Sequence, residues 1–348
     1  MEKNIEAKER KALKSRIYYL DFLRGFAIIM VVLLHCMSSY ITVSEIYGST
    51  SWYIYLVLNA ITRTGVPIFI MISGYLILSS EKEEGVWEFY KKRIPRLVIP
   101  LVAWNIIYLL YRYFIQGSQV DFKTVLTEFF NVGTYYHMWY LYTLAGIYLF
   151  APFLKMIVKK CTTKQLGVLV AVMVLRSSVI PHINTVFNLQ IYMFEPMVNG
   201  YLAFFVTGCF LGRLKVTKKL LAVFGVTGVC GFSASVYYSH FESSSAYINL
   251  VFNYGSALCH FALAASVFVF AMYFCRDGFL YKIFGSISRV SLGIYLVHVL
   301  VLEQIQKYFM PTASPVVCTA YLFVVVFPVS YAVSYVISKI KYVNRIVV

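Results

Sequence analysis

Long apolar runs recur from one end of this sequence to the other, and they constrain the fold more than any other feature. Several reach the ~20 residues that an α-helix needs to cross a lipid bilayer. The 348 residues are 60% hydrophobic and 13% charged, whereas soluble domains are typically about 45–50% apolar. No stretch between the runs is long enough for a soluble domain. We therefore expect an all-α polytopic membrane protein in which residues 1–348 form a single integral-membrane domain.

The distribution of charge predicts how the chain is oriented in the membrane. The apolar runs predict about ten transmembrane helices, at residues 18–40, 52–79, 94–115, 137–155, 165–181, 195–213, 220–238, 250–274, 290–309 and 316–338. If the N-terminus lies inside the cell, 25 of the 31 Lys and Arg residues fall in inner segments. The positive-inside rule thus accounts for the net charge of +16 without a nucleic-acid partner, and both termini are expected to be cytoplasmic. The seven cysteines include no CxxC pair, so no metal site is expected.

The first apolar run, YLDFLRGFAIIMVVLLHC at residues 18–35, contains three residues that are costly to place in a bilayer. Eleven helical steps separate Arg24 from His35, which puts both on one face and ~16 Å apart along the axis. Asp21 lies one turn from Arg24 and can pair with it. Charged side chains in membrane helices usually face the protein interior or a water-filled cavity. We expect Arg24 and His35 to line a common passage; the alternative is an interfacial ion pair and a core histidine.

Four later stretches complete an ordered set with the first helix. They are RTGVPIFIMISGYLI (63–77), KKRIPRLVIPLVAW (91–104), HMWYLYTLAGIYLFAP (137–152) and SRVSLGIYLVHVLVL (288–302). With the arginine, ten residues and histidine of the first helix, this set resembles the membrane acyltransferase family three, multi-pass O-acyltransferases that modify cell-envelope glycans. Each stretch alone is weak, but five in the same order make the resemblance specific.

The resemblance implies transfer of an acyl group, most often acetyl from cytoplasmic acetyl-CoA, to a sugar hydroxyl in a bacterial cell membrane. Acetyl-CoA is then a donor substrate, and no permanently bound cofactor is expected. Histidine can be neutral at physiological pH, so His35 is the expected general base, although it could instead carry the acetyl group covalently. Arg24, held by Asp21, is expected to orient the donor or to stabilise developing negative charge. Arg93 and Arg96, expected at a helix start, are the candidate phosphate ligands.

The remaining matched residues are expected to bind substrate or support the site. Trp139 can stack on a sugar ring at the outer face, although an interfacial aromatic belt is an equal alternative. Tyr295 and His298 share a helix face, which suggests packing or a polar network. The full set of supporting candidates is Arg63, Ser73, His137, Trp139, Tyr295 and His298.

Three alternatives remain open from the sequence. Buried charges among ten helices also suit a transporter or flippase of a polysaccharide or its lipid-linked precursor. An O-succinyltransferase of the same family would differ only in its donor. A separate extracytoplasmic partner could complete the transfer, and the chain could form a homo-oligomer. In every case the expected partners are the lipid bilayer and a glycan or lipid-linked sugar, with acyl-CoA added for the enzymes.

Overall fold

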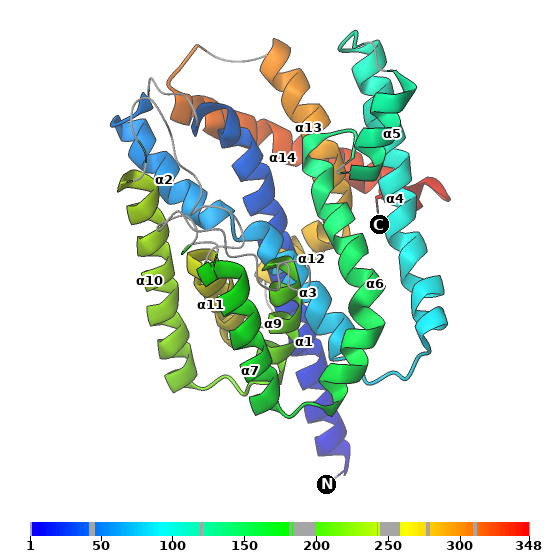
Figure 1. Ribbon diagram of the computed structural model, residues 1–348, viewed down its shortest axis with the longest axis vertical. Helices are drawn as coiled ribbons and strands as arrows, with labels where there is room; N and C mark the ends of the chain where they lie inside the picture. Colours follow the sequence, from blue (N-terminus) through cyan, green and yellow to red (C-terminus); the bar gives the residue numbers. More distant parts are fainter. Residues whose placement is uncertain are drawn as a thin grey trace.

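The computed structural model describes residues 2–41, 46–118, 121–131, 133–180, 183, 200–241, 243, 258–275, 279–308 and 312–347, without the side chains of 2–17, 39, 41 and 279–281. The regular structure within these ranges is helical throughout, with no strand, which confirms the all-α class. The helices stand roughly side by side in a bundle (Figure 1).

The helical segments, in chain order, are α1 (Glu2–Ile41), α2 (Thr50–Thr62), α3 (Gly65–Leu78), α4 (Val86–Phe114), α5 (Phe122–Asn131), η2 (Tyr136–Met138), α6 (Trp139–Lys160), α7 (Thr163–Val174), the π-helical turn η3 (Leu175–Val179), α9 (Gly200–Arg213), α10 (Lys218–Phe241), α11 (Leu258–Phe274), α12 (Phe279–Arg289), α13 (Ser291–Tyr308), α14 (Pro315–Lys339) and η5 (Val343–Ile346). α1 packs against α2, α3, α12, α13 and α14 and so lies at the centre of the part that carries the candidate residues.

Six segments of the described chain are long and apolar enough to cross a membrane, or seven if the bent pair α12–α13 counts as one span. The α9 and α11 helices are apolar but shorter. Parts of four predicted helices, at 181, 195–199, 250–257 and 309, lie outside the described residues. The expected count of ten therefore stays a prediction.

The predicted helix at 52–79 is broken in the structure. The α2 helix ends at Thr62 and α3 begins at Gly65. Pro67 accounts for the break, because proline lacks an N–H and its ring clashes with the carbonyl four residues earlier, here that of Arg63. Asn59 then accepts a hydrogen bond of 3.1 Å from Arg63 Nε, which fixes the arginine at the break.

Small residues let the α3 and α9 helices pack closely against each other. A Cβ added at Gly74 of α3 would overlap the backbone carbonyl of Phe205, and one added at Gly208 of α9 would overlap that of Met71. Small residues permit such close backbone approach between membrane helices. Gly74 and Gly208 therefore bring the backbones of α3 and α9 into close contact.

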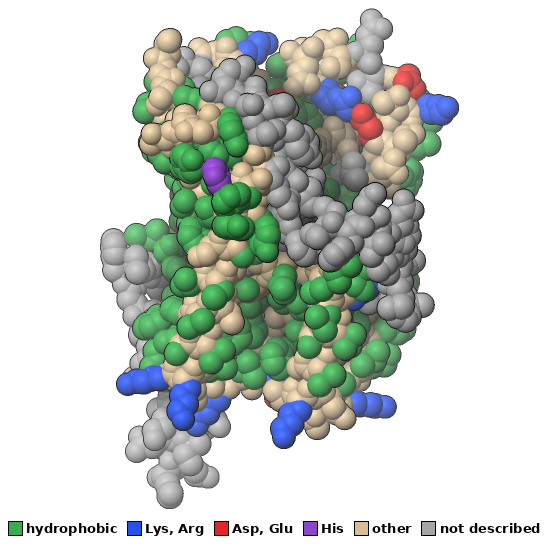
Figure 2. Space-filling view, turned by 60° about the vertical axis from the view of Figure 1, so that its left-hand side comes forward, with side chains coloured by type: hydrophobic (Ala, Val, Ile, Leu, Met, Phe, Trp, Pro, Cys, Tyr) green, Lys and Arg blue, Asp and Glu red, His purple; other side chains and the backbone are tan. Residues whose placement is uncertain are grey.

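The surface divides into an apolar body and basic ends. In Figure 2 the sides of the bundle are largely hydrophobic, and Lys and Arg side chains gather at the end where α1 begins. This pattern is the one on which the expected orientation rests. The cytoplasmic location of the termini stays a prediction.

Candidate active site

His35 lines a cavity of about 330 Å³, called here the outer cavity. The break between α2 and α3 supplies Arg63 to its wall, and aromatic side chains supply much of the rest. Trp139 and Tyr201 face each other there, with ring centroids 5.2 Å apart. A pair of aromatic rings beside an imidazole forms a surface suited to a ring-shaped neutral ligand.

The hydrogen bonds around His298 determine its tautomer. Its Nδ1 lies 2.6 Å from the carbonyl oxygen of Tyr295 and 3.2 Å from that of Ile294. Carbonyl oxygens only accept, so Nδ1 of His298 carries the proton and Nε2 of the neutral ring is an acceptor. That Nε2 lies 3.2 Å from Nδ1 of His35.

The hydrogen-bond acceptors around His35 determine its tautomer as well. Its Nδ1 faces two acceptors, the Val31 carbonyl oxygen at 2.8 Å and the Nε2 of His298. Nδ1 of His35 is therefore the protonated nitrogen, and Nε2 of the neutral ring carries the lone pair. If Nε2 takes up a proton, the imidazolium still donates from Nδ1 to both acceptors. This arrangement equips His35 as a general base and His298 as the group that fixes its tautomer.

His137 joins these two histidines in a buried cluster. Its ring centroid lies 5.5 Å from that of His298, and its carbonyl oxygen accepts a hydrogen bond from the Tyr295 hydroxyl. Only 1% of its surface is exposed, and it does not line the outer cavity. Of the two neighbouring candidates His137 and Trp139, only Trp139 lines the outer cavity, and the supporting role expected for His137 stays a prediction. Within the described residues, no group of three or more His, Cys, Asp or Glu side chains could hold a metal ion.

A second cavity of about 430 Å³, the inner cavity, contains the predicted arginines. Arg24, Arg93 and Arg96 all line it, together with Ser73. Arg24 pairs with Asp21 at 3.5 Å, as the sequence predicts. Asp21 in turn accepts a hydrogen bond of 2.7 Å from the Ser288 hydroxyl, which ties α1 to the end of α12.

The two arginines of α4 differ in their partners. Both oxygens of Glu84 accept hydrogen bonds from Nη1 of Arg93, at 2.9 and 2.5 Å. These bonds hold the pKa of the Glu84 carboxyl below its ordinary value, so the ion pair persists at neutral pH. Within the described chain, Arg96 has no carboxylate oxygen within 4.0 Å. Its charge is therefore available to a ligand.

The expected helix N-terminus at the arginines is absent. The α4 helix begins at Val86, about two turns before Arg93, because the apolar and helix-favouring residues from Val86 onward extend it. The amide groups that a helix N-terminus offers thus lie elsewhere. Arg24, Arg93 and Arg96 supply the positive charges of the inner cavity.

The two cavities share one lining residue. Tyr295 lines both, while His35 lines only the outer and Arg24 only the inner cavity. Arg24 and His35 therefore line different cavities that meet at Tyr295, and the common passage expected for them stays a prediction. Sequence spacing placed both residues on one face, but it gave no information on what the neighbouring helix inserts between them.

A model of a known family, described as an acyltransferase domain, matches residues 17–339. The chain belongs to acyltransferase family 3. The match covers every residue of both cavities, so these cavities lie within the acyltransferase domain. No curated protein and no solved structure matches the acyltransferase at a significant level.

Four residues of the site escaped the sequence analysis: Asn59, Glu84, Tyr136 and Tyr201. Asn59 precedes Arg63 by four residues, a helical spacing that could have suggested the contact. Tyr136, whose ring centroid lies 5.7 Å from that of His35, immediately precedes a predicted helix. Glu84 and Tyr201 come from segments with no matched motif, and only the packing of the helices brings them to the cavities.

Proposed function

We propose that this membrane acyltransferase moves an acetyl group from cytoplasmic acetyl-CoA to a sugar hydroxyl of a cell-envelope polysaccharide or lipid-linked glycan. The observation that carries the proposal is the set of hydrogen bonds around His35: its Nδ1 donates to the Val31 carbonyl and to Nε2 of His298, whose own Nδ1 donates to the Tyr295 carbonyl. It leaves a basic nitrogen on a residue that lines a cavity, next to a second cavity with three arginines. Base and anion site thus lie on opposite sides of Tyr295.

The inner cavity suits the donor. Coenzyme A carries phosphates, and guanidinium groups bind phosphate through charge-assisted hydrogen bonds. Arg96 supplies a charge without a carboxylate partner in the described chain, and Arg24 shares its charge with Asp21 at the longer distance of 3.5 Å. The thioester would approach Tyr295 from this side.

The outer cavity suits the acceptor. A sugar offers hydroxyl groups at its edge and C–H groups on its faces, which pack on aromatic rings. Trp139 and Tyr201 supply the rings, and Asn59 and Arg63 supply polar groups. The acceptor hydroxyl would then lie against His35.

In the transfer step, His35 accepts and then releases one proton. Nε2 takes the proton of the sugar hydroxyl as its oxygen attacks the thioester carbonyl carbon, so a C–O bond forms and the C–S bond breaks. The electron pair of the C–S bond leaves with the sulfur of coenzyme A. The proton held on Nε2 then passes to that thiolate, which releases the free thiol and restores neutral His35.

The test is release of free thiol by the purified protein in detergent. With acetyl-CoA and a candidate acceptor, an acyltransferase yields coenzyme A and an acceptor 42 mass units heavier, the size of an acetyl group. A transporter or flippase would yield neither, and that result would falsify the proposal. Succinyl-CoA as a second donor identifies the acyl group, and intact-protein mass after donor alone detects an acetylated histidine.

A further inference from the structure

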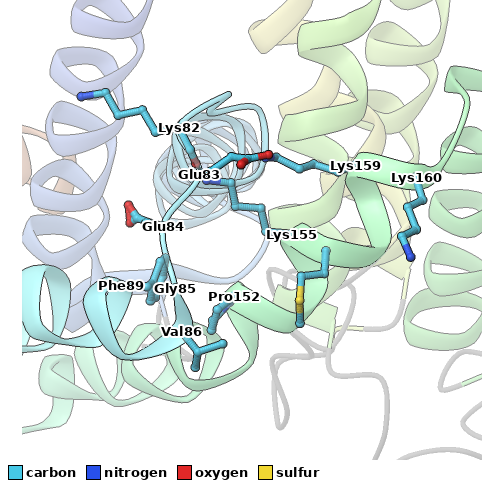
Figure 3. A pocket seen from close by; sticks show the side chains of 11 residues that line it. Lys82, Glu83, Glu84, Gly85, Val86, Phe89, Pro152, Lys155, Lys159 and Lys160 are labelled. Atoms are coloured by element: carbon cyan, nitrogen blue, oxygen red, sulfur yellow. Dashed lines mark hydrogen bonds between the residues drawn. The ribbon is translucent and has the colours of Figure 1, made fainter.

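A third cavity, the basic pocket, lies between the segment joining α3 to α4 and the last turns of α6. It measures about 730 Å³. Its charged lining residues are Lys82, Glu83, Glu84, Lys155, Lys159 and Lys160. Figure 3 shows that the Lys155 and Lys159 side chains extend toward the 82–85 segment, whereas those of Lys82 and Lys160 extend away from it.

Lys155 is buried at the wall of this pocket. Its residue surface is 7% exposed, and its Nζ donates a hydrogen bond of 2.8 Å to the Lys82 carbonyl oxygen. In the described part of the chain no carboxylate oxygen lies within 4.0 Å of that nitrogen. A buried ammonium is costly unless it is compensated, and two of its three N–H groups remain for another acceptor. The positive-inside rule explains lysines at this end of the bundle, but not the burial of one against a cavity.

The start of α4 adds to the same attraction. Gly85 and Val86 line the pocket, and Gly85, as N-cap, has no side chain that could bond the first amide groups of the helix. Such free amides favour an anion. Of the two glutamates, Glu84 is already compensated by Arg93, which leaves Glu83 against four lysines.

The basic pocket and the inner cavity follow one another along the α4 and α6 helices. On α6, Leu144 and Tyr148 line the inner cavity, and Pro152 and Lys155 line the basic pocket. These positions lie on one helix face, at steps of three or four residues. The ion pair between Arg93 of α4 and Glu84, two residues before α4, links the two, since Arg93 lines the inner cavity and Glu84 the basic pocket.

We propose that the basic pocket binds the 3′-phosphoadenosine end of the acyl-CoA donor, with Lys155 and Lys159 contacting its 3′-phosphate, while its diphosphate lies toward the arginines of the inner cavity. This inference rests on the proposed function. From Lys155 to Leu141 the α6 helix rises ~21 Å, a span that requires a ligand with a charged end and a long arm. Acyl-CoA has this shape, so its arm would pass the Arg93–Glu84 pair and bring the thioester into the inner cavity toward Tyr295.

The test compares a full donor with a truncated one. For Lys159→Gln, and for Lys155→Gln if it folds, we expect the KM for acetyl-CoA to rise about tenfold, since a charge-assisted phosphate contact is lost. The KM for S-acetylpantetheine, which lacks the nucleotide, should change by less than about twofold on the same reasoning. Lys164→Gln removes a lysine at the start of α7 that lines none of the three cavities, and it should leave both values unchanged.

Binding of a nucleotide alone tests the basic pocket independently of acyl transfer. Adenosine 3′,5′-bisphosphate should bind the wild-type protein in a neutral detergent, and Lys159→Gln should weaken it about tenfold, whether or not any acyl group is transferred. Equal changes in KM for both donors, or unchanged nucleotide binding in Lys159→Gln, would overturn the proposal. The proposal would also be overturned if the lysine variants lost only the anionic lipid that copurifies with the protein, because the lysines would then bind a lipid phosphate.

Discussion

The inner and outer cavities lie on either side of one tyrosine, yet their linings differ in kind. The inner cavity has three arginines and the outer has one, Arg63, whose Nε is bonded to Asn59. The outer cavity instead has His35 and a pair of facing aromatic rings. Guanidinium groups select for negative charge, whereas an imidazole among aromatic rings suits a neutral hydroxyl compound. With the donor and acceptor placed as proposed, the difference in lining would sort the two substrates by charge before they meet.

The largest effect should come from removing the base of the outer cavity. His35→Ala is expected to lower kcat by about 100-fold or more, the range of general base catalysis, with donor binding unchanged. Free-thiol release and donor binding measure the two sides separately. His240→Ala, on α10 and outside both cavities, is the matched control. Substantial turnover in His35→Ala would show that the outer cavity is not the site of proton transfer.

A smaller loss should follow from His298→Phe, which removes the acceptor that fixes the tautomer of His35. We expect kcat to fall about 10- to 100-fold, below the cost of losing the base itself, while both KM values stay within about twofold. His298→Gln should retain more activity than His298→Phe, because an amide oxygen can still accept from Nδ1 of His35. Equal losses in both variants would indicate a packing role only.

Arg96→Gln should affect only the inner cavity. Loss of one charge-assisted contact predicts an increase of about tenfold in the KM for acetyl-CoA, with the KM for the acceptor unchanged. Lys91→Gln removes an exposed charge from the same helix outside the cavity and is the control. If the acceptor KM rose instead, the assignment of the two cavities would be reversed.

The smallest effect is expected from Trp139→Ala. The loss of one aromatic face should raise the acceptor KM by about three- to tenfold, since such contacts contribute ~0.5–1.5 kcal/mol. The donor KM should not move. Trp87→Ala removes an exposed tryptophan at the start of α4 and controls for general effects on the membrane-embedded protein. A change in donor KM alone would contradict the sorting of substrates.

The helical class and the residues of α1 could be predicted from the sequence, because membrane helices obey length, hydrophobicity and a fixed 100° step. The Asp21–Arg24 pair follows from that step and is confirmed. The start of α4 and the break at Arg63 were missed, because local propensity decides the first and a proline four residues after Arg63 decides the second. The candidate roles of the cavity residues stay predictions.

Contacts between helices far apart in the chain could not be derived. His35 and His298 lie 263 positions apart, and nothing in either motif indicates that their rings meet. The Arg93–Glu84 pair joins a matched motif to an unmatched segment. Such contacts depend on how helices cross, which here rests on close approaches such as that at Gly74.

The single ring of Tyr295 has a consequence for the cell as a whole. A pore from one face of a membrane to the other would dissipate the proton-motive force, and Tyr295 lines both cavities. We expect Tyr295→Ala to make sealed liposomes containing the protein leak protons, as followed by an entrapped pH-sensitive dye. The wild-type ring would then let an acetyl group change sides while the ionic barrier stays closed.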